Sequence, residues 1–60
     1  MDPSAILREI KQLTNVSVRL DAMAAQHPIV SDALLGISGS VRNSAILLEV
    51  LVAVKMPPVS

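Results

Sequence analysis

Two stretches of the chain carry apolar residues at helical spacing, and a short segment around His27-Pro28 separates them. In the first stretch, apolar and small residues recur at alternating intervals of four and three: Ile6, Ile10, Leu13, Ser17, Leu20 and Ala24. This spacing predicts an amphipathic helix over about residues 3–26. Asp2 is suited to cap that helix, and Pro3 suits its first position, where no backbone donor is needed.

The second stretch predicts another helix, over about residues 32–55, after a connection at 27–31. Its start is open, because either Pro28 or Ser31 could begin it. Its expected seam, the row of residues that meets the first helix, consists of Leu34, Ile37, Val41, Ser44, Leu48, Leu51 and Lys55. Gly36 and Gly39 weaken the helix, each by about 1 kcal/mol relative to alanine. A break at Gly36–Gly39, with a separate helix capped by Ser40, is the alternative to the continuous helix that we prefer. Residues 56–60 are expected to fray.

Two matched helices joined by a short connection predict an all-α fold, an antiparallel two-helix hairpin forming one domain over residues 1–60. Nine of the ten residues in Ala45–Val54 are apolar, and they point to every side of the helix. A helix that is apolar all round must be covered on all sides. We therefore expect the hairpin to self-associate into a four-helix bundle, most simply a homodimer. The expected oligomer interface comprises Ala45, Leu47, Leu48, Leu51, Val52 and Val54. A tetramer is expected if Ile46 and Val50 are covered as well.

The amino-acid composition argues against disulfides, metal sites and nucleic-acid partners as means of stabilising so short a chain. The 60 residues include no cysteine and one histidine, so disulfides and a histidine-based metal site within one chain are not expected. Phe, Trp and Tyr are absent, which removes the aromatic platforms that stack on nucleic-acid bases. The formal net charge is zero, without the basic cluster that binds phosphates, so no nucleic-acid partner is expected.

A few residues are candidates for chemistry, and each has a simpler structural role. His27 titrates near neutrality but is better explained as the end of a helix, where its cation suits the helix dipole. Glu49 is either a buried carboxylate or, as we prefer, a solvated residue on the stripe that Arg42 shares. Ser38, Ser40 and Ser44 lack a base and an oxyanion hole and are expected to allow tight packing. We therefore predict no enzyme, no catalytic residue, no metal and no cofactor.

Residues 33–56 are long enough to cross a bilayer, but they contain Arg42 and Glu49, which oppose insertion. The chain begins Met-Asp-Pro, without the basic segment and apolar run of a signal peptide, so a cytoplasmic location is expected. The leading hypothesis is a non-enzymatic oligomerisation or protein-interaction module. The alternative is an adaptor or chaperone-like subunit that donates its second helix to an unidentified protein. A hairpin that binds nucleic acid, or a membrane-associated peptide, ranks below both, and a small molecule bound between subunits stays open.

Overall fold

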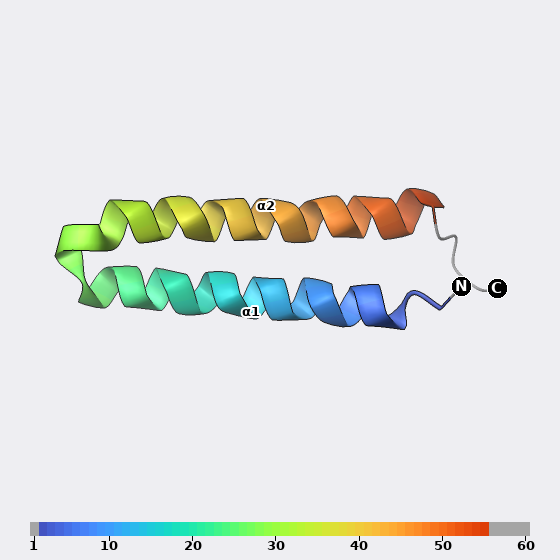
Figure 1. Cartoon of the computed structure of the whole chain (residues 1–60), viewed down its shortest axis with the longest axis horizontal. Coiled ribbons are helices and arrows are strands. Elements are labelled where there is room, and N and C mark those ends of the chain that lie inside the picture. The colour runs from blue at the N-terminus through green and yellow to red at the C-terminus, as the bar shows by residue number, and fades with distance from the viewer. Residues whose placement is uncertain (1, 56–60) are drawn as a thin grey trace.

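The computed structural model describes residues 2–55, and it consists of two helices lying side by side in opposite directions (Figure 1). Helix α1 spans Ser4–Gln26, a single turn of 3-10 helix, η1, spans Pro28–Val30, and helix α2 spans Ser31–Lys55. The prediction of an all-α helical hairpin is confirmed. The predicted fraying at 56–60 falls on residues outside the described range.

Asp2 caps the start of α1, as the sequence predicts. Its Oδ1 accepts a hydrogen bond from the Ser4 backbone N–H at 3.0 Å, and its Oδ2 accepts one from the Ser4 hydroxyl at 2.8 Å. Pro3 already has helical angles, and its carbonyl accepts a hydrogen bond from the Leu7 N–H at 2.9 Å. Pro3 therefore serves as the first helical residue, where its missing N–H leaves no helix bond unmade.

The connection reverses the chain within four residues. His27 leaves the helical conformation, with φ −130° and ψ 77°, because the ring of Pro28 disfavours the α region in the preceding residue. The Val30 N–H donates to the His27 carbonyl at 3.1 Å and closes the turn of η1. Ser31 then donates its N–H to the Pro28 carbonyl and continues directly into α2. Pro28 thus starts the turn, and Ser31 starts the second helix.

Helix α2 is continuous through Gly36 and Gly39, so the break considered above does not form. A Cβ added at either glycine would meet nothing within 4 Å, which shows that neither is required for close packing against α1. The flanking residues Leu34, Ser38 and Val41 are buried or half-buried. Their contact with α1 offsets the roughly 1 kcal/mol that each helix-interior glycine costs.

The predicted seam of α1 is confirmed. Its members Ile10, Ser17 and Ala24 are buried, and Ile6, Leu13 and Leu20 are half-buried. The fully buried positions recur every seven residues, which is the repeat of helices that pack along their length as a coiled coil.

The predicted seam of α2 is wrong at every second position. Ile37 and Leu51 are 53% and 42% exposed, and Ser44 is exposed as well. The residues that face α1 are instead Ser31, Leu34, Ser38, Val41, Ala45, Leu48 and Val52. Because α2 carries apolar and small residues on several faces, its spacing alone does not determine which face meets α1.

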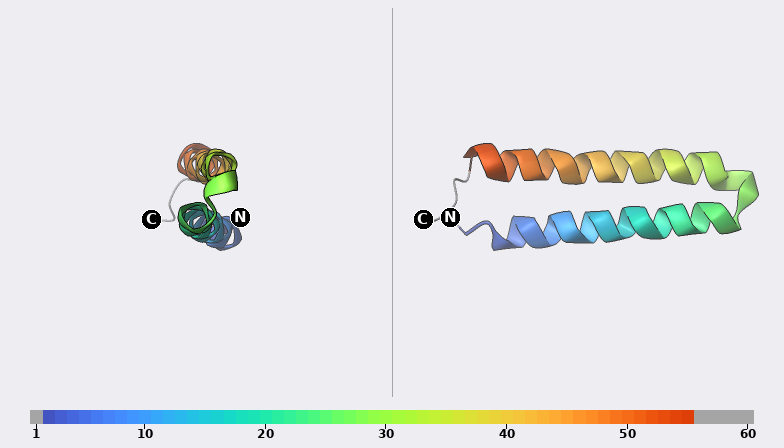
Figure 2. Two further views of the ribbon diagram at one scale, coloured as in Figure 1. Left: turned by 90° about the vertical axis from the view of Figure 1, so that its left-hand side faces the viewer. Right: turned by 180° about the vertical axis from the view of Figure 1, so that it is seen from behind.

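The apolar core between the two helices is thin. The buried apolar residues of the described range are Ile10, Ala24 and Ala45, and two of these are alanines. The end-on view shows α1 and α2 in contact along one side each, with no third element of the described chain over their other sides (Figure 2). Most of the large apolar side chains of α2 therefore face outward.

Candidate functional site

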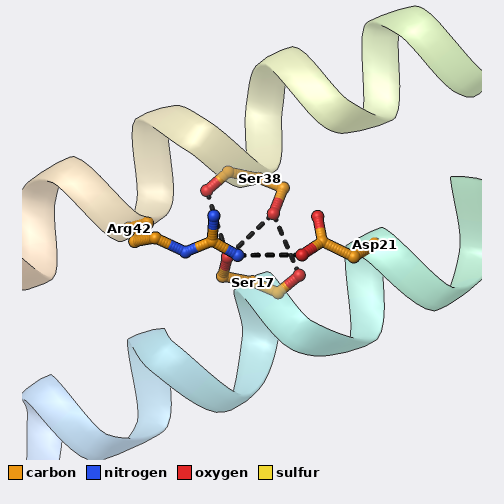
Figure 3. Close-up of polar contacts among 4 residues, drawn as sticks. All are labelled: Ser17, Asp21, Ser38 and Arg42. Atoms are coloured by element: carbon orange, nitrogen blue, oxygen red, sulfur yellow. Dashed lines mark hydrogen bonds and ion pairs between the residues drawn. The ribbon is translucent and has the colours of Figure 1, made fainter.

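Two serines form the tightest contact between the helices. The hydroxyls of Ser17 in α1 and Ser38 in α2 are 2.8 Å apart, and these residues are 0% and 1% exposed (Figure 3). The Ser38 hydroxyl also donates to the Ser17 carbonyl at 3.0 Å, and the Ser17 hydroxyl lies 3.3 Å from the Ser38 carbonyl. Each hydroxyl thus reaches the backbone of the opposite helix, which only a small side chain at both positions permits.

This serine pair sets the register of the hairpin. Among the described residues, no buried side-chain nitrogen or oxygen lacks a hydrogen-bond partner. Sliding one helix past the other would bury the two hydroxyls against apolar neighbours, and a buried polar group without a partner costs about 1–3 kcal/mol. The pair therefore favours one alignment over alternatives that apolar contacts alone would tolerate.

Asp21 and Arg42 bridge the helices beside the serine pair. The Arg42 guanidinium donates to Asp21 Oδ2 at 2.8 Å, and Figure 3 shows the two side chains converging from opposite sides of the serines. Side chains lean toward the N-terminus of their own helix, so in an antiparallel pair these two lean toward each other. Both side chains are solvated, Arg42 at 52% and Asp21 at 39% exposure, so the ion pair adds little stability.

The carboxyl group of Asp21 is perturbed by the same contacts. The nearby Ser38 hydroxyl and the hydrogen bond from Arg42 hold the pKa of Asp21 below its usual value. A lowered pKa in the folded state means that the ionised carboxylate stabilises the hairpin.

Stability should consequently fall in acid through Asp21. The contribution is complete above the unfolded-state pKa of about 3.9 and disappears as the pH drops through the lower folded-state value. In thermal melts followed by circular dichroism, the wild type should have a higher midpoint than Asp21→Asn at pH 7, and the two midpoints should approach each other at about pH 2. An advantage that is unchanged across this range would contradict the role of the ionised carboxylate.

The structure does not bring the other candidate residues together. His27 is exposed at the turn, and Glu49 is exposed on α2. Ser40 and Ser44 point away from α1 and donate to carbonyls of their own helix, those of Gly36 and Ser40, at 3.2 and 3.1 Å. Of the three serines expected to allow tight packing, only Ser38 lies between the helices. In residues 2–55 no pocket is found, and no three potential metal ligands cluster.

The two sides of the hairpin differ in polarity. One side is identified by the Asp21–Arg42 contact, and these residues directly follow the seam residues Leu20 and Val41. The same side carries Thr14 and Glu49, which directly follow Leu13 and Leu48, and the exposed leucines Leu7 and Leu35, which follow Ile6 and Leu34. One step along a helix turns it by about 100°. Residues that directly precede a seam position therefore lie toward the opposite side of the hairpin from those that follow one.

That opposite side is the candidate interaction surface. We call it the apolar flank, and its large residues are Val16, Met23, Ile37, Leu47, Leu51 and Val54. Val16 is half-buried, and the other five are between 42% and 67% exposed. Large apolar side chains that adjoin one another on a surface mark places where another molecule binds.

The residues expected at an oligomer interface divide between two locations. Leu47, Leu51 and Val54 lie on the apolar flank. Ala45 is 2% exposed between α1 and α2, and Leu48 and Val52 are half-buried there, so these three contact the chain's own first helix. Contact of any of the six with a second chain stays a prediction.

Two contacts could not be found from the sequence as it was interpreted above. Ser17 was correctly placed on the seam of α1, but its partner Ser38 was not among the residues expected on the seam of α2. The Asp21–Arg42 pair was missed for the same reason. A usable signal exists, since small residues recur every seven positions in both helices, at Ser17 and Ala24 in the first and at Ser31, Ser38 and Ala45 in the second.

Within residues 2–55, one helical stretch, Pro28–Lys55, is long and apolar enough to cross a membrane. Little of this stretch is buried within the hairpin. The result reflects length and composition, which a membrane span shares with a helix that other helices cover. It agrees with the outward-facing apolar residues of α2 in showing how little of this helix α1 covers.

Comparisons with protein-family models, with curated proteins and with solved structures find no match for this chain.

Proposed function

We propose that this protein is a non-enzymatic interaction module whose hairpins pair through the apolar flank to form a four-helix bundle. The observation that carries the proposal is the exposure of the large apolar side chains of α2. Those on the apolar flank are Ile37, Leu47, Leu51 and Val54, and Leu35, Ile46 and Val50 are exposed on other sides of the helix. Helix α1 leaves them in water, and their burial would be favourable at about 25 cal/mol per Å².

The shape of the hairpin supports pairing with another hairpin. The polar flank carries the ion pair of Asp21 and Arg42, whereas the apolar flank extends over both helices from Met23 and Ile37 to Leu51. Stacking two hairpins with their apolar flanks together leaves both ion pairs in water. Glu9, which precedes the seam residue Ile10, is the charged residue that lies in line with Val16 and Met23 on this flank.

The mass of the isolated chain in solution tests the proposal. Analytical ultracentrifugation at micromolar concentration should give twice the chain mass or more, and the thermal midpoint should rise with protein concentration. A folded monomer, helical by circular dichroism and independent of concentration, would rule the proposal out. A chain that is poorly helical until a different protein is added would instead favour the adaptor hypothesis.

A further inference from the structure

Helix α2 carries a second row of residues with the same spacing as its seam. The row consists of Ala33, Ile37, Ser40, Ser44, Leu47, Leu51 and Val54, all of them exposed. Each member directly precedes a position of the first row, the seam that faces α1, as Leu47 precedes Leu48 and Leu51 precedes Val52. The second row is therefore the first row turned by about 100° around the helix axis.

An angle of this size is what a four-helix bundle requires. Each helix of such a bundle meets two neighbours, whose directions are roughly at right angles. Helix α1 occupies the first row of α2, through residues such as Ser38 and Ala45. The second row has the alternating three- and four-residue spacing that a further helix would need.

The serines of the second row are prepared for burial. Ser40 donates its hydroxyl to the Gly36 carbonyl, and Ser44 donates to the Ser40 carbonyl. A helix that covered these residues would thus leave neither hydroxyl donor without a partner. Ser38 differs, because its hydroxyl reaches across to α1. The serine of the first row bonds to the other helix, whereas those of the second row bond within α2. An apolar partner can therefore cover the second row.

Side-chain volumes along the second row favour a second α2 that runs in the opposite direction. Its small residues Ala33 and Ser40 belong to the first half of α2, and its large residues Leu47 and Val54 to the second half. An antiparallel copy centred on Ser44 places Ala33 opposite Val54 and Ser40 opposite Leu47. A parallel copy in register would place small residues opposite small ones at three of the seven positions, Ala33, Ser40 and Ser44, whereas the antiparallel copy does so only at Ser44.

Charge at the ends of α2 favours the same direction. Asp32 lies in the first turn and Lys55 in the last turn. Antiparallel pairing brings Asp32 of one chain to the same end as Lys55 of the other. Parallel pairing would place like charges side by side at each end, and it would also align the two helix dipoles.

We propose that the occupant of this second row is the α2 helix of a second copy of the chain, antiparallel and related by a twofold axis near Ser44. This inference rests on the proposed self-association and specifies its register. Sliding one antiparallel α2 along the other by a repeat would keep the spacing but leave Ala33 or Val54 without a partner. In the proposed register, all seven positions face a residue of the second copy.

Single cysteines can test the register, because the chain contains no cysteine of its own. In the full-length protein, Ser44→Cys should form a disulfide-linked dimer readily under mild oxidation, since a twofold axis brings the two sulfurs together. Val54→Cys should not, because antiparallel copies separate the two positions by ~30 Å along the helix. A mixture of Ala33→Cys and Val54→Cys chains should give the mixed dimer. Asn15→Cys, on the outer face of α1, measures random collision.

The outcomes separate this inference from the proposed function. Circular dichroism and ultracentrifugation of the reduced variants first establish that each is folded and self-associated. If Val54→Cys cross-links as fast as Ser44→Cys, the helices are parallel and the proposed register is wrong, although self-association stands. If Ser44→Cys cross-links no faster than Asn15→Cys in an associated protein, the second row is not the interface. A monomer would overturn the proposed function as well as the register.

Discussion

Replacing Ser38 by leucine is expected to unfold the hairpin or to destabilise it by about 3 kcal/mol or more. Ser38 is 1% exposed, and its hydroxyl contacts both the hydroxyl and the carbonyl of Ser17. A leucine there must push α1 away, and forcing larger side chains into a packed site typically costs about 1–3 kcal/mol. It also removes the Ser38 hydroxyl and, by separating the helices, takes the Ser38 carbonyl out of reach of the Ser17 hydroxyl, which adds about 1–3 kcal/mol.

Urea or thermal denaturation followed by circular dichroism measures this effect. The matched control is Asn15→Leu, which adds the same side chain to an exposed position on the outer side of α1 and should change stability little. Ser38→Ala should lie between the two, because the Ser17 hydroxyl keeps the Ser38 carbonyl as an acceptor at 3.3 Å. A Ser38→Leu protein as stable as the wild type would show that the helices do not approach closely at this point.

Replacing Leu51 by aspartate is expected to dissociate the proposed dimer. Leu51 is 42% exposed in the hairpin and belongs to both the apolar flank and the second row of α2. In the proposed dimer it packs opposite Ile37 of the second chain, so each dimer would bury two aspartates among apolar groups. Burying an unpaired charge costs several kcal/mol, and about 3 kcal/mol already weakens association about a hundredfold.

Leu35→Asp is the matched control for this variant. Leu35 is on the same helix and is 48% exposed, but it lies on the polar flank, where it directly follows the seam residue Leu34. Sedimentation over a range of concentrations should show Leu51→Asp as a monomer with reduced helicity and Leu35→Asp associated like the wild type. Equal effects of the two substitutions would show that apolar exposure in general, and not the apolar flank, drives association.

For the first helix, the sequence was sufficient to predict both its limits and its buried face. Asp2 and Pro3 mark its start, and the bonds between Asp2 and Ser4 follow the expected cap. Its polar residues occupy a continuous face, so only one row, from Ile6 to Ala24, can face a partner. Val16 and Met23 widen this row on one side and Leu7 widens it on the other, so the centre of the apolar stripe determines the orientation of the helix.

For the second helix, the sequence predicted the helix but not its orientation. Residues on at least two rows have the correct spacing, and the expected seam took alternate members from each: Leu34 and Val41 from one, Ile37 and Ser44 from the other. Ile37 and Leu51 are larger and more hydrophobic than Ser38 and Ala45, yet they face outward. The hairpin instead buries Ser38 and Ala45, whose small side chains let the helices approach.

The sequence by itself therefore determined two helices, the turn at His27-Pro28 and an excess of apolar surface on the second helix. These properties depend on local spacing, caps and composition, which neighbouring residues in the chain establish among themselves. Only the tertiary structure decided which row of α2 meets α1, and with it the pairs Ser17–Ser38 and Asp21–Arg42. That choice depends on fit between two surfaces, since small residues must coincide across the seam and each buried hydroxyl must find a partner on the other helix.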